Sequence, residues 1–182
     1  MNLSFLPNLA FPEAKVFDKV VKLCKKADQK GAIERRQRWL GALFADDIER
    51  GAHNDFVIRW IDGKVGYGVF ATKDMAPFAF VGEYTGEVRK RVRDDKRNSY
   101  CFTYLIGDEK KSSYIIDAEK KGNITRFINH SDTPNLEPIS VFSGGVMHVI
   151  LLTRTWIQKG QQLTYDYGED YWKKREKPLL FQ

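Results

Sequence analysis

The run Arg-Phe-Ile-Asn-His-Ser-Asp-Thr-Pro-Asn at residues 126–135 constrains the fold of this chain more than any other feature. A second run, Leu-Thr-Tyr-Asp-Tyr-Gly at residues 163–168, begins 28 residues after the first one ends. Glu-Tyr-Thr-Gly-Glu at 83–87 lies upstream, and Gly-Tyr-Gly at 66–68 lies further upstream. Each segment alone is common in loops and turns. The information therefore lies in their order and spacing.

The composition is that of a packed globular protein. Hydrophobic residues make up 42% of the 182 residues, which is enough to exclude a wholly disordered chain and to build one domain with a modest core. The formal net charge of +6 favours anionic partners such as nucleic acid or an acidic surface, but only as a tendency. A solvated surface explains the same charge equally well.

Cysteine and histidine usage argues against a disulfide framework and a metal site. Cys24 and Cys101 are the two cysteines, so we expect free thiols and no four-thiolate zinc site. The three histidines show no metal-ligand spacing: they are His53, His130 and His148.

No apolar run reaches the length that crosses a bilayer, so no membrane partner is expected. The first 12 residues lack a basic segment and are broken by Pro7 and Pro12. We therefore expect no Sec signal peptide.

The first third of the chain is predicted to be helical. Apolar side chains recur at helical spacing over residues 13–30 and again over 32–50, and the two stretches end at Gly31 and Gly51. We assign residues 1–55 to an N-terminal helical extension. Its apolar stripes can pack on the rest of the chain, form a homodimer surface or bind substrate, and packing is the default.

The pattern changes after residue 55 to short strands separated by turn residues. The charged segment 89–97 is predicted to be an exposed helix or loop, and Asp62-Gly63 and Ser143-Gly144-Gly145 are hairpin signals. Residues 56–172 form the predicted main domain, and residues 173–182 a basic tail. The predicted strands are 56–61, 69–71, 78–81, 100–106, 114–116 and 147–152.

Taken together, the four segments resemble the SET domain. The resemblance covers about residues 56–172 and implies a mostly β fold with some α: several small sheets and a β-clip with a pseudoknot, preceded here by the helical extension. It also implies an S-adenosylmethionine-dependent protein-lysine N-methyltransferase. In that family, the first run is threaded by the chain near the Tyr-Asp-Tyr segment.

The resemblance implies a cofactor site without metal. The Gly-Tyr-Gly turn would contact the methionine part, Asn129 would hold the charged amino acid end, and His130 would offer backbone groups to adenine and a side-chain hydrogen bond to the threaded segment. Trp172 either stacks on adenine or only packs. The full set of implied cofactor contacts is Lys64, Gly66, Tyr67, Gly68, Arg126, Asn129, His130, Tyr167 and Trp172.

Tyr167 matches the catalytic tyrosine of the family. Methyl transfer to nitrogen is an in-line displacement, in which alignment alone can contribute roughly 7–11 kcal/mol. The lysine must be neutral, and both burial and a nearby positive charge lower its pKa from about 10.4. No dedicated base is therefore required, and Asp166 is expected to anchor the loop.

The substrate channel would involve four tyrosines. The resemblance places Tyr84 along the channel and implies that Tyr165, where the family carries Tyr or Phe, restricts the product to mono- or dimethyllysine. Tyr100 and Tyr104 are further candidates, for which core packing is an equal alternative.

The chain departs from many family members because no cysteine follows Cys101, so a zinc segment cannot close the site. Its segments at 3–7, 65–71, 82–86 and 171–173 resemble those of the SET-domain histone methyltransferases of chlamydial bacteria. That likeness implies a secreted effector acting on chromatin in the host nucleus, or an enzyme for histone-like proteins in the bacterial cytoplasm.

The implied partners are a histone or histone-like protein and a nucleosome or other DNA-bound protein. The alternatives are a non-catalytic SET-fold module that binds chromatin or a partner, and a methyltransferase of a non-chromatin protein.

Overall fold

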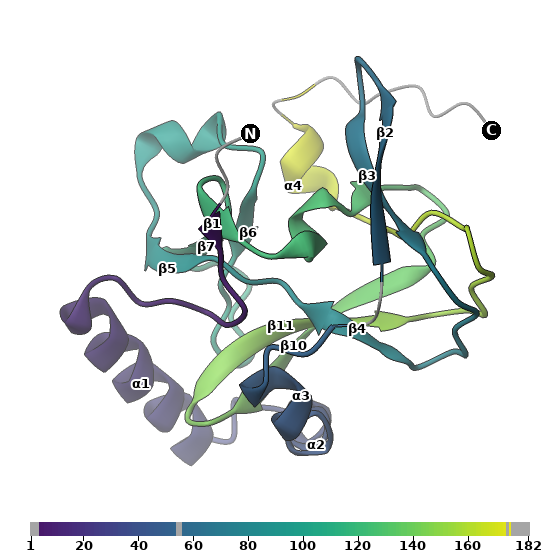
Figure 1. The fold of residues 1–182 in the computed structure, drawn as a ribbon. Coiled ribbons are helices and arrows are strands. Elements are labelled where there is room, and N and C mark those ends of the chain that lie inside the picture. The colour runs from purple at the N-terminus through teal and green to yellow at the C-terminus, as the bar shows by residue number, and fades with distance from the viewer. Residues whose placement is uncertain (1–3, 54–55, 174, 176–182) are drawn as a thin grey trace. The chain divides into compact units, whose positions relative to one another are not determined.

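A computed structural model of the chain describes residues 4–53, 56–173 and 175 (Figure 1). The chain divides into two compact units. The first unit comprises residues 1–53, 82–126 and 139–150, and the second comprises 54–81, 127–138 and 151–182. The mostly β fold of several small sheets agrees with the SET-domain fold class predicted from the sequence.

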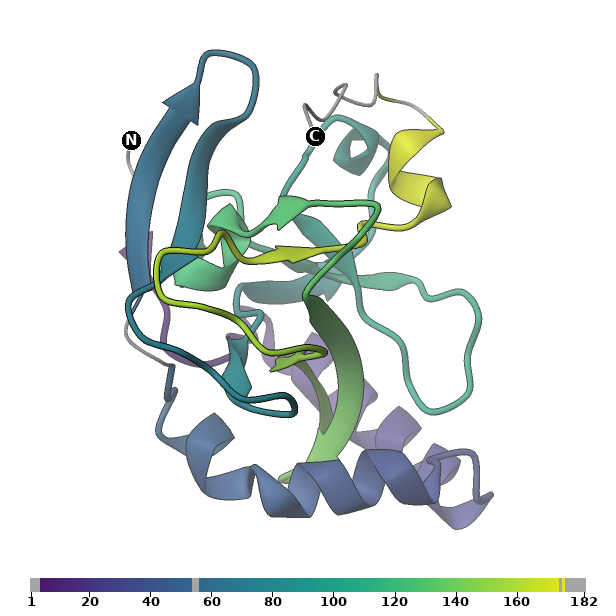
Figure 2. The same ribbon diagram turned by 90° about the vertical axis from the view of Figure 1, so that its right-hand side faces the viewer.

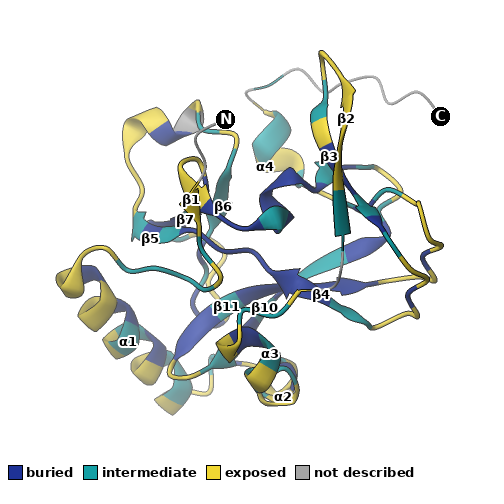
Figure 3. Cartoon of the chain, in the orientation of Figure 1, coloured by how far each residue is buried: buried dark blue, intermediate teal, exposed yellow. Residues whose placement is uncertain are grey.

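Helix α1 (Ala14–Gln29) of the first unit confirms the helix predicted over residues 13–30. Val16, Val20 and Cys24 recur every four residues and are buried, so they form one apolar stripe. The stripe joins the core of the first unit, which means that packing covers it, as expected by default. The opposite face of α1 is exposed (Figure 3).

The predicted helix over 32–50 is two helices, α2 (Arg35–Leu43) and α3 (Ala45–Glu49). Phe44 separates them because its φ of −105° and ψ of 16° are not helical. Helix α2 lies against strand β10: a Cβ on Gly41 would come 1.9 Å from the carbonyl oxygen of Phe142. Only glycine permits this approach.

Two small sheets belong to the first unit. Strands β5 (Glu87–Lys90), β7 (Tyr114–Asp117) and β6 (Cys101–Thr103) form an antiparallel sheet in that order. Strand β1 (Ser4–Phe5) pairs in parallel with β8 (Lys121–Gly122).

The charged segment 89–97 differs from the prediction. Its first residues belong to β5, and only Arg93–Lys96 form a 3₁₀ helix, η1. The strand accommodates its charge because the Arg89 guanidinium lies 2.5 Å from Asp95 and 2.7 Å from Asp117. Paired charges of this kind are found in partly buried positions that a lone arginine avoids.

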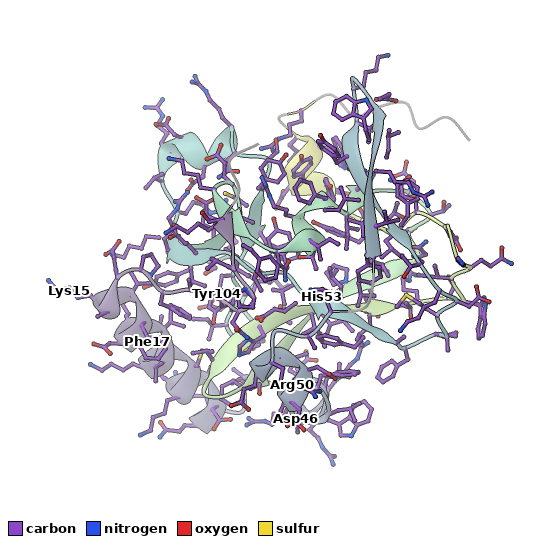
Figure 4. The ribbon with its side chains drawn as sticks, in the orientation of Figure 1. Lys15, Phe17, Asp46, Arg50, His53 and Tyr104 are labelled. Carbon is purple, nitrogen blue, oxygen red and sulfur yellow. The ribbon has the colours of Figure 1, made fainter. Side chains whose placement is uncertain are left out.

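Tyr104 lies at the centre of the first unit's core (Figure 4). Its side chain is fully buried, and its hydroxyl donates to the Met147 carbonyl at 2.8 Å and accepts from the Met147 amide at 3.0 Å. Both hydrogen-bonding capacities of the phenol are thereby used, as a buried hydroxyl requires.

The second unit contains a long β-hairpin (Figure 2). Strands β2 (Phe56–Asp62) and β3 (Gly66–Ala71) pair antiparallel, which confirms the hairpin signal at Asp62-Gly63. The Asp62 carboxylate accepts from the amides of Lys64 and Val65, both at 2.7 Å. These bonds stabilise the turn and lower the pKa of Asp62. The second unit also holds β9 (Asn129–His130), β12 (Thr164–Tyr165) and α4 (Glu169–Trp172).

Three strands form one sheet in the order β10 (Leu136–Ser143), β11 (Val146–Thr153) and β4 (Phe80–Glu83). The turn at Gly144-Gly145 joins β10 to β11, as its sequence predicts. Strand β10 is absent from the predicted strands, and it contains Pro138. Proline is tolerated there since β10 lies at the edge of its sheet. The short helix η2 (Ile124–Phe127) precedes β9.

The boundaries of the helical extension and of the main domain stay predictions. The basic tail at 173–182 lies largely outside the described residues, which include only Lys173 and Arg175 of it. Within the described part of the chain, no helix is both long and apolar enough to cross a membrane.

The two thiols are free, and burial makes them poor nucleophiles. Burial raises the pKa of Cys24 to about 11 and that of Cys101 to about 12. Since only the thiolate reacts, we expect both thiols to label with a disulfide reagent at pH 8 at least about 100-fold more slowly in the folded chain than in urea. Equal rates in the two states would contradict this.

Candidate functional site

The two runs singled out in the sequence lie side by side in the second unit. Strand β9 pairs in parallel with β12, so that Asn129 opposes Thr164 and His130 opposes Tyr165. Asn135 extends the contact: its amide donates to the Gln162 carbonyl at 2.8 Å and accepts from the Thr164 amide at 2.9 Å. The fold thus brings together segments that are separated by a β-hairpin in sequence.

His130 fixes the path of the chain at Tyr167. Its Nδ1 accepts from the Tyr167 amide at 3.1 Å, and the ring is 6% exposed. Because Nδ1 accepts, the neutral ring carries its proton on Nε2, which lies 3.3 Å from a carboxylate oxygen of Asp132. This contact confirms the predicted side-chain bond from His130 to the second run.

Asp166 anchors the turn that follows, as predicted. Its carboxylate accepts from the Gly168 amide at 2.9 Å. Gly168 has a φ of 82°, a conformation that glycine adopts without strain.

Asn129 joins the first run to the β2–β3 hairpin. Its Nδ2 donates to the Tyr67 carbonyl at 3.0 Å. A Cβ on Gly68 would lie 2.6 Å from the Ile61 side chain, 2.8 Å from Gln162 and 3.1 Å from Asn129. A side chain at residue 68 would therefore have to displace the ends of these neighbouring side chains.

Gly66 and Lys64 differ from Gly68. The space beside Gly66 is open, and its φ of 79° accounts for the glycine. Lys64 is exposed in the turn. The Tyr67 ring packs edge-on against Trp60 and Phe127, with ring centroids 5.1 and 6.1 Å away. The cofactor contacts predicted for Lys64, Gly66 and Tyr67 stay predictions.

An aromatic cluster surrounds Tyr167. Its hydroxyl donates to the Ile128 carbonyl at 2.8 Å, and its ring stacks on Trp172 at 6.0 Å with an interplanar angle of 9°. Tyr165 and Tyr171 lie 4.8 and 4.7 Å from the same ring. Trp172 also contacts His130 at 4.8 Å, so α4 places two aromatic side chains over the site.

Three polar atoms of this cluster have unused hydrogen-bonding capacity among the described residues, and the first is Nε2 of His130. The indole N–H of Trp172 is buried and has no hydrogen-bond partner among the described residues. The side-chain oxygen of Asn129 likewise has no partner in the part of the chain that is described. Buried polar groups are normally satisfied, so the Trp172 N–H is suited to a ligand. The Asn129 oxygen is half-buried and can bind water or a ligand.

The other predicted residues belong to the first unit. The Tyr84 side chain is 3% exposed and donates to the Tyr100 carbonyl at 2.9 Å. The Arg126 guanidinium lies 3.7 Å from the centre of the Tyr100 ring. The full burial of Tyr104 favours the core-packing alternative weighed for it.

Sequence reasoning missed two contributors to the site, the Ile128 carbonyl and Gln162, whereas Tyr171 was expected beside Trp172 as an aromatic side chain after the second run. The Ile128 carbonyl receives the Tyr167 hydroxyl, Gln162 binds Asn135 and borders Gly68, and Tyr171 packs on Tyr167. A backbone carbonyl and a lone glutamine carry no signal in the sequence.

The sequence pattern of the SET domain matches residues 66–168, which is more than half of the chain. The chain belongs to the SET domain family. The human histone-lysine N-methyltransferase EHMT1 is 35% identical over 59% of this chain, and mouse SETD2, also a histone-lysine N-methyltransferase, is 36% identical over 71%. The chain spans only 9% and 5% of their lengths.

Solved structures with a similar fold support membership of the family. A polycomb repressive complex 2 from Chaetomium thermophilum matches with a TM-score of 0.60 and 27% identity, over 72% of this chain and 17% of that one. An inhibitor-bound, humanized form of the complex matches at 0.58 and 30%, over 67% and 16%. This SET domain chain thus resembles histone-lysine N-methyltransferases in sequence and chains of polycomb repressive complex 2 in fold.

The packing at Gly68 predicts the effect of a single methyl group. Gly68→Ala should lower the free energy of unfolding by about 1 kcal/mol, the low end of the cost of overpacking, because the methyl group displaces only the ends of the Ile61, Gln162 and Asn129 side chains. Chemical denaturation measures the change. Gly63→Ala in the same hairpin is the control, since a Cβ there has no atom within 4 Å. Equal effects of the two changes would contradict the packing.

Proposed function

We propose that this SET domain chain is an S-adenosylmethionine-dependent protein-lysine N-methyltransferase for histones or histone-like basic proteins. The observation that carries the proposal is the fixed position of Tyr167, whose amide is bound by His130 and whose hydroxyl is bound by the Ile128 carbonyl. Membership of the family and the names of its relatives support the reaction type.

The residues around Tyr167 fit the proposed cofactor, which supplies a methyl group on a positively charged sulfur. The Asn129 side-chain oxygen can accept from the ammonium of its amino acid end. The Trp172 ring and its unused N–H suit a heteroaromatic base. Electron-rich tyrosine faces also suit a sulfonium cation.

The chain's own contribution is alignment and exclusion of water. The Tyr167 hydroxyl donates its hydrogen to the Ile128 carbonyl, which orients its oxygen for weak C–H···O contacts with a polarised methyl group. Ile128 is 1% exposed, so the packing around this residue holds its carbonyl in place. A lysine nitrogen held in line beside this oxygen needs only to be neutral, and its burial favours that form.

Tyr165 is the proposed limit on the number of methyl groups transferred. It is 7% exposed, and its ring lies 4.8 Å from Tyr167. A phenol in this position occupies the volume that successive methyl groups on the lysine nitrogen would need. We accordingly propose mono- and dimethylation.

The proposed substrates include a nucleosome or other DNA-bound protein, in host chromatin or among the bacterium's own histone-like proteins. The formal charge of +6 suits substrates whose basic tails lie beside DNA phosphates. A homodimer is compatible with the proposal.

Tyr167→Phe should lower kcat at least about 100-fold, on the scale seen when one positioned transition-state contact is removed. Transfer of labelled methyl to histone octamer, nucleosomes and a bacterial histone-like protein measures the effect. Tyr171→Phe is the matched control, because the Tyr171 hydroxyl makes no hydrogen bond within the described residues. Cofactor binding without transfer to any substrate would favour a non-catalytic binding module.

Tyr165→Phe should shift the products toward trimethyllysine, because it removes the hydroxyl that restricts the space around the nitrogen. Mass spectrometry of a peptide carrying one target lysine gives the product ratio. The same ratio for the wild type and the variant would disprove the proposed limit.

A further inference from the structure

A cationic cavity lies in the first unit, and no residue discussed for transfer lines it. Its volume is about 450 Å³, and it opens between α1, the end of β5 and the loop before β7. Its lining includes four cationic side chains and the single carboxylate of Glu109; the cations are Lys19, Lys90, Arg91 and Lys111. Ser112 and Ser113 line it as well, and hydroxyl groups can donate to anionic oxygens.

The positive charge of this cavity is not neutralised internally. Lys19, Lys90 and Lys111 make no side-chain hydrogen bond or ion pair among the described residues. Arg91 donates to the neutral hydroxyl of Thr103 at 3.0 Å. Arg89, one residue further back, differs because Asp95 and Asp117 both pair with it. The strand thus satisfies one cation and leaves the next two for an external anion.

The charge continues along α1 beyond the cavity. Lys15, Lys19, Lys22 and Lys26 are exposed and, at about 100° per residue, fall within about 60° of one another around the helix. Figure 4 shows Lys15 extending away from the helix. From Lys15 to Lys26 the row spans about 16 Å at 1.5 Å per residue, a length that suits several phosphates in succession.

We propose that the cavity and the lysine row of α1 together form a binding surface for the phosphate backbone of duplex DNA. The surface goes beyond the proposed activity. Its use in delivering DNA-bound substrates rests on that activity, but DNA binding itself does not.

The shape and chemistry of the surface favour a nucleic acid. A small anion would occupy the cavity and leave the row of lysines unexplained. Phosphopeptide sites use arginine forks, whereas this surface is built mostly from lysines, which bind phosphate as point charges. Its lining contains no Asn or Gln, the side chains that read adenine. We therefore expect binding that does not depend on DNA sequence.

Fluorescence anisotropy with a labelled 20-base-pair duplex, without cofactor, tests the surface over a range of salt. The variant Lys19→Gln/Lys90→Gln/Lys111→Gln should bind at least about 30-fold more weakly at 100 mM salt. The slope of log K against log salt should fall by about 2 to 3. These three side chains have no partners among the described residues, so the variant should stay folded.

The control variant Lys73→Gln/Lys120→Gln/Lys159→Gln removes the same charge from exposed lysines outside the cavity. Both variants carry +6 − 3 = +3. Glu109→Gln should strengthen binding, since it removes the carboxylate from the lining. Equal losses in both triple variants, or binding to phosphatidylserine vesicles but not to DNA, would overturn the proposal.

The assay separates this inference from the proposed enzyme. Methyl transfer to a free basic protein needs no DNA, and the anisotropy assay needs no transfer. Loss of DNA binding with transfer to free protein intact rejects only the DNA surface.

Discussion

The hydrogen bonds between residues 129–135 and 162–167 hold the site together. A parallel ladder of two residues is too short to persist alone. Asn135 extends it with two bonds to the backbone, and His130 adds a third at Tyr167. Because these side chains are largely buried, removing one would leave backbone groups unsatisfied away from water. The positions of the Asn129 amide and the Tyr167 hydroxyl follow from these bonds.

The same contacts separate structural polar groups from those left for chemistry. Asn135 and His130 bind the chain's own backbone, as buried polar groups usually do, and the exposed Asp166 binds the Gly168 amide. The Asn129 oxygen and the Trp172 N–H are not used in this way within the described residues. The first unit repeats this division with charge: Arg89 is paired by two aspartates, while Lys19, Lys90 and Lys111 face solvent at a cavity.

Sequence patterns predicted the elements whose apolar residues repeat at a regular spacing or whose turn residues mark their ends. Helix α1 and the β2–β3 hairpin are where periodicity and turn residues place them. The secondary-structure prediction was wrong where contacts with other parts of the chain determine the local structure. Strand β10 contains Pro138, which only an edge position tolerates, and β5 keeps its arginine because two distant aspartates reach it. The predicted helix over 32–50 breaks at Phe44.

The sequence by itself determined the family, through the order and spacing of its runs, and identified Asn129, His130 and Tyr167 as candidates. It determined local structure wherever a hydrogen bond or a steric limit acts between near neighbours, as at Asp62 and Gly168. Only the tertiary structure decided that Gly68 lies against the ends of the Ile61 and Gln162 side chains, that Tyr104 is a core residue, and that α1 and β5 share a cationic cavity. Packing and electrostatics depend on distances in space, and the sequence does not specify these until the chain has folded.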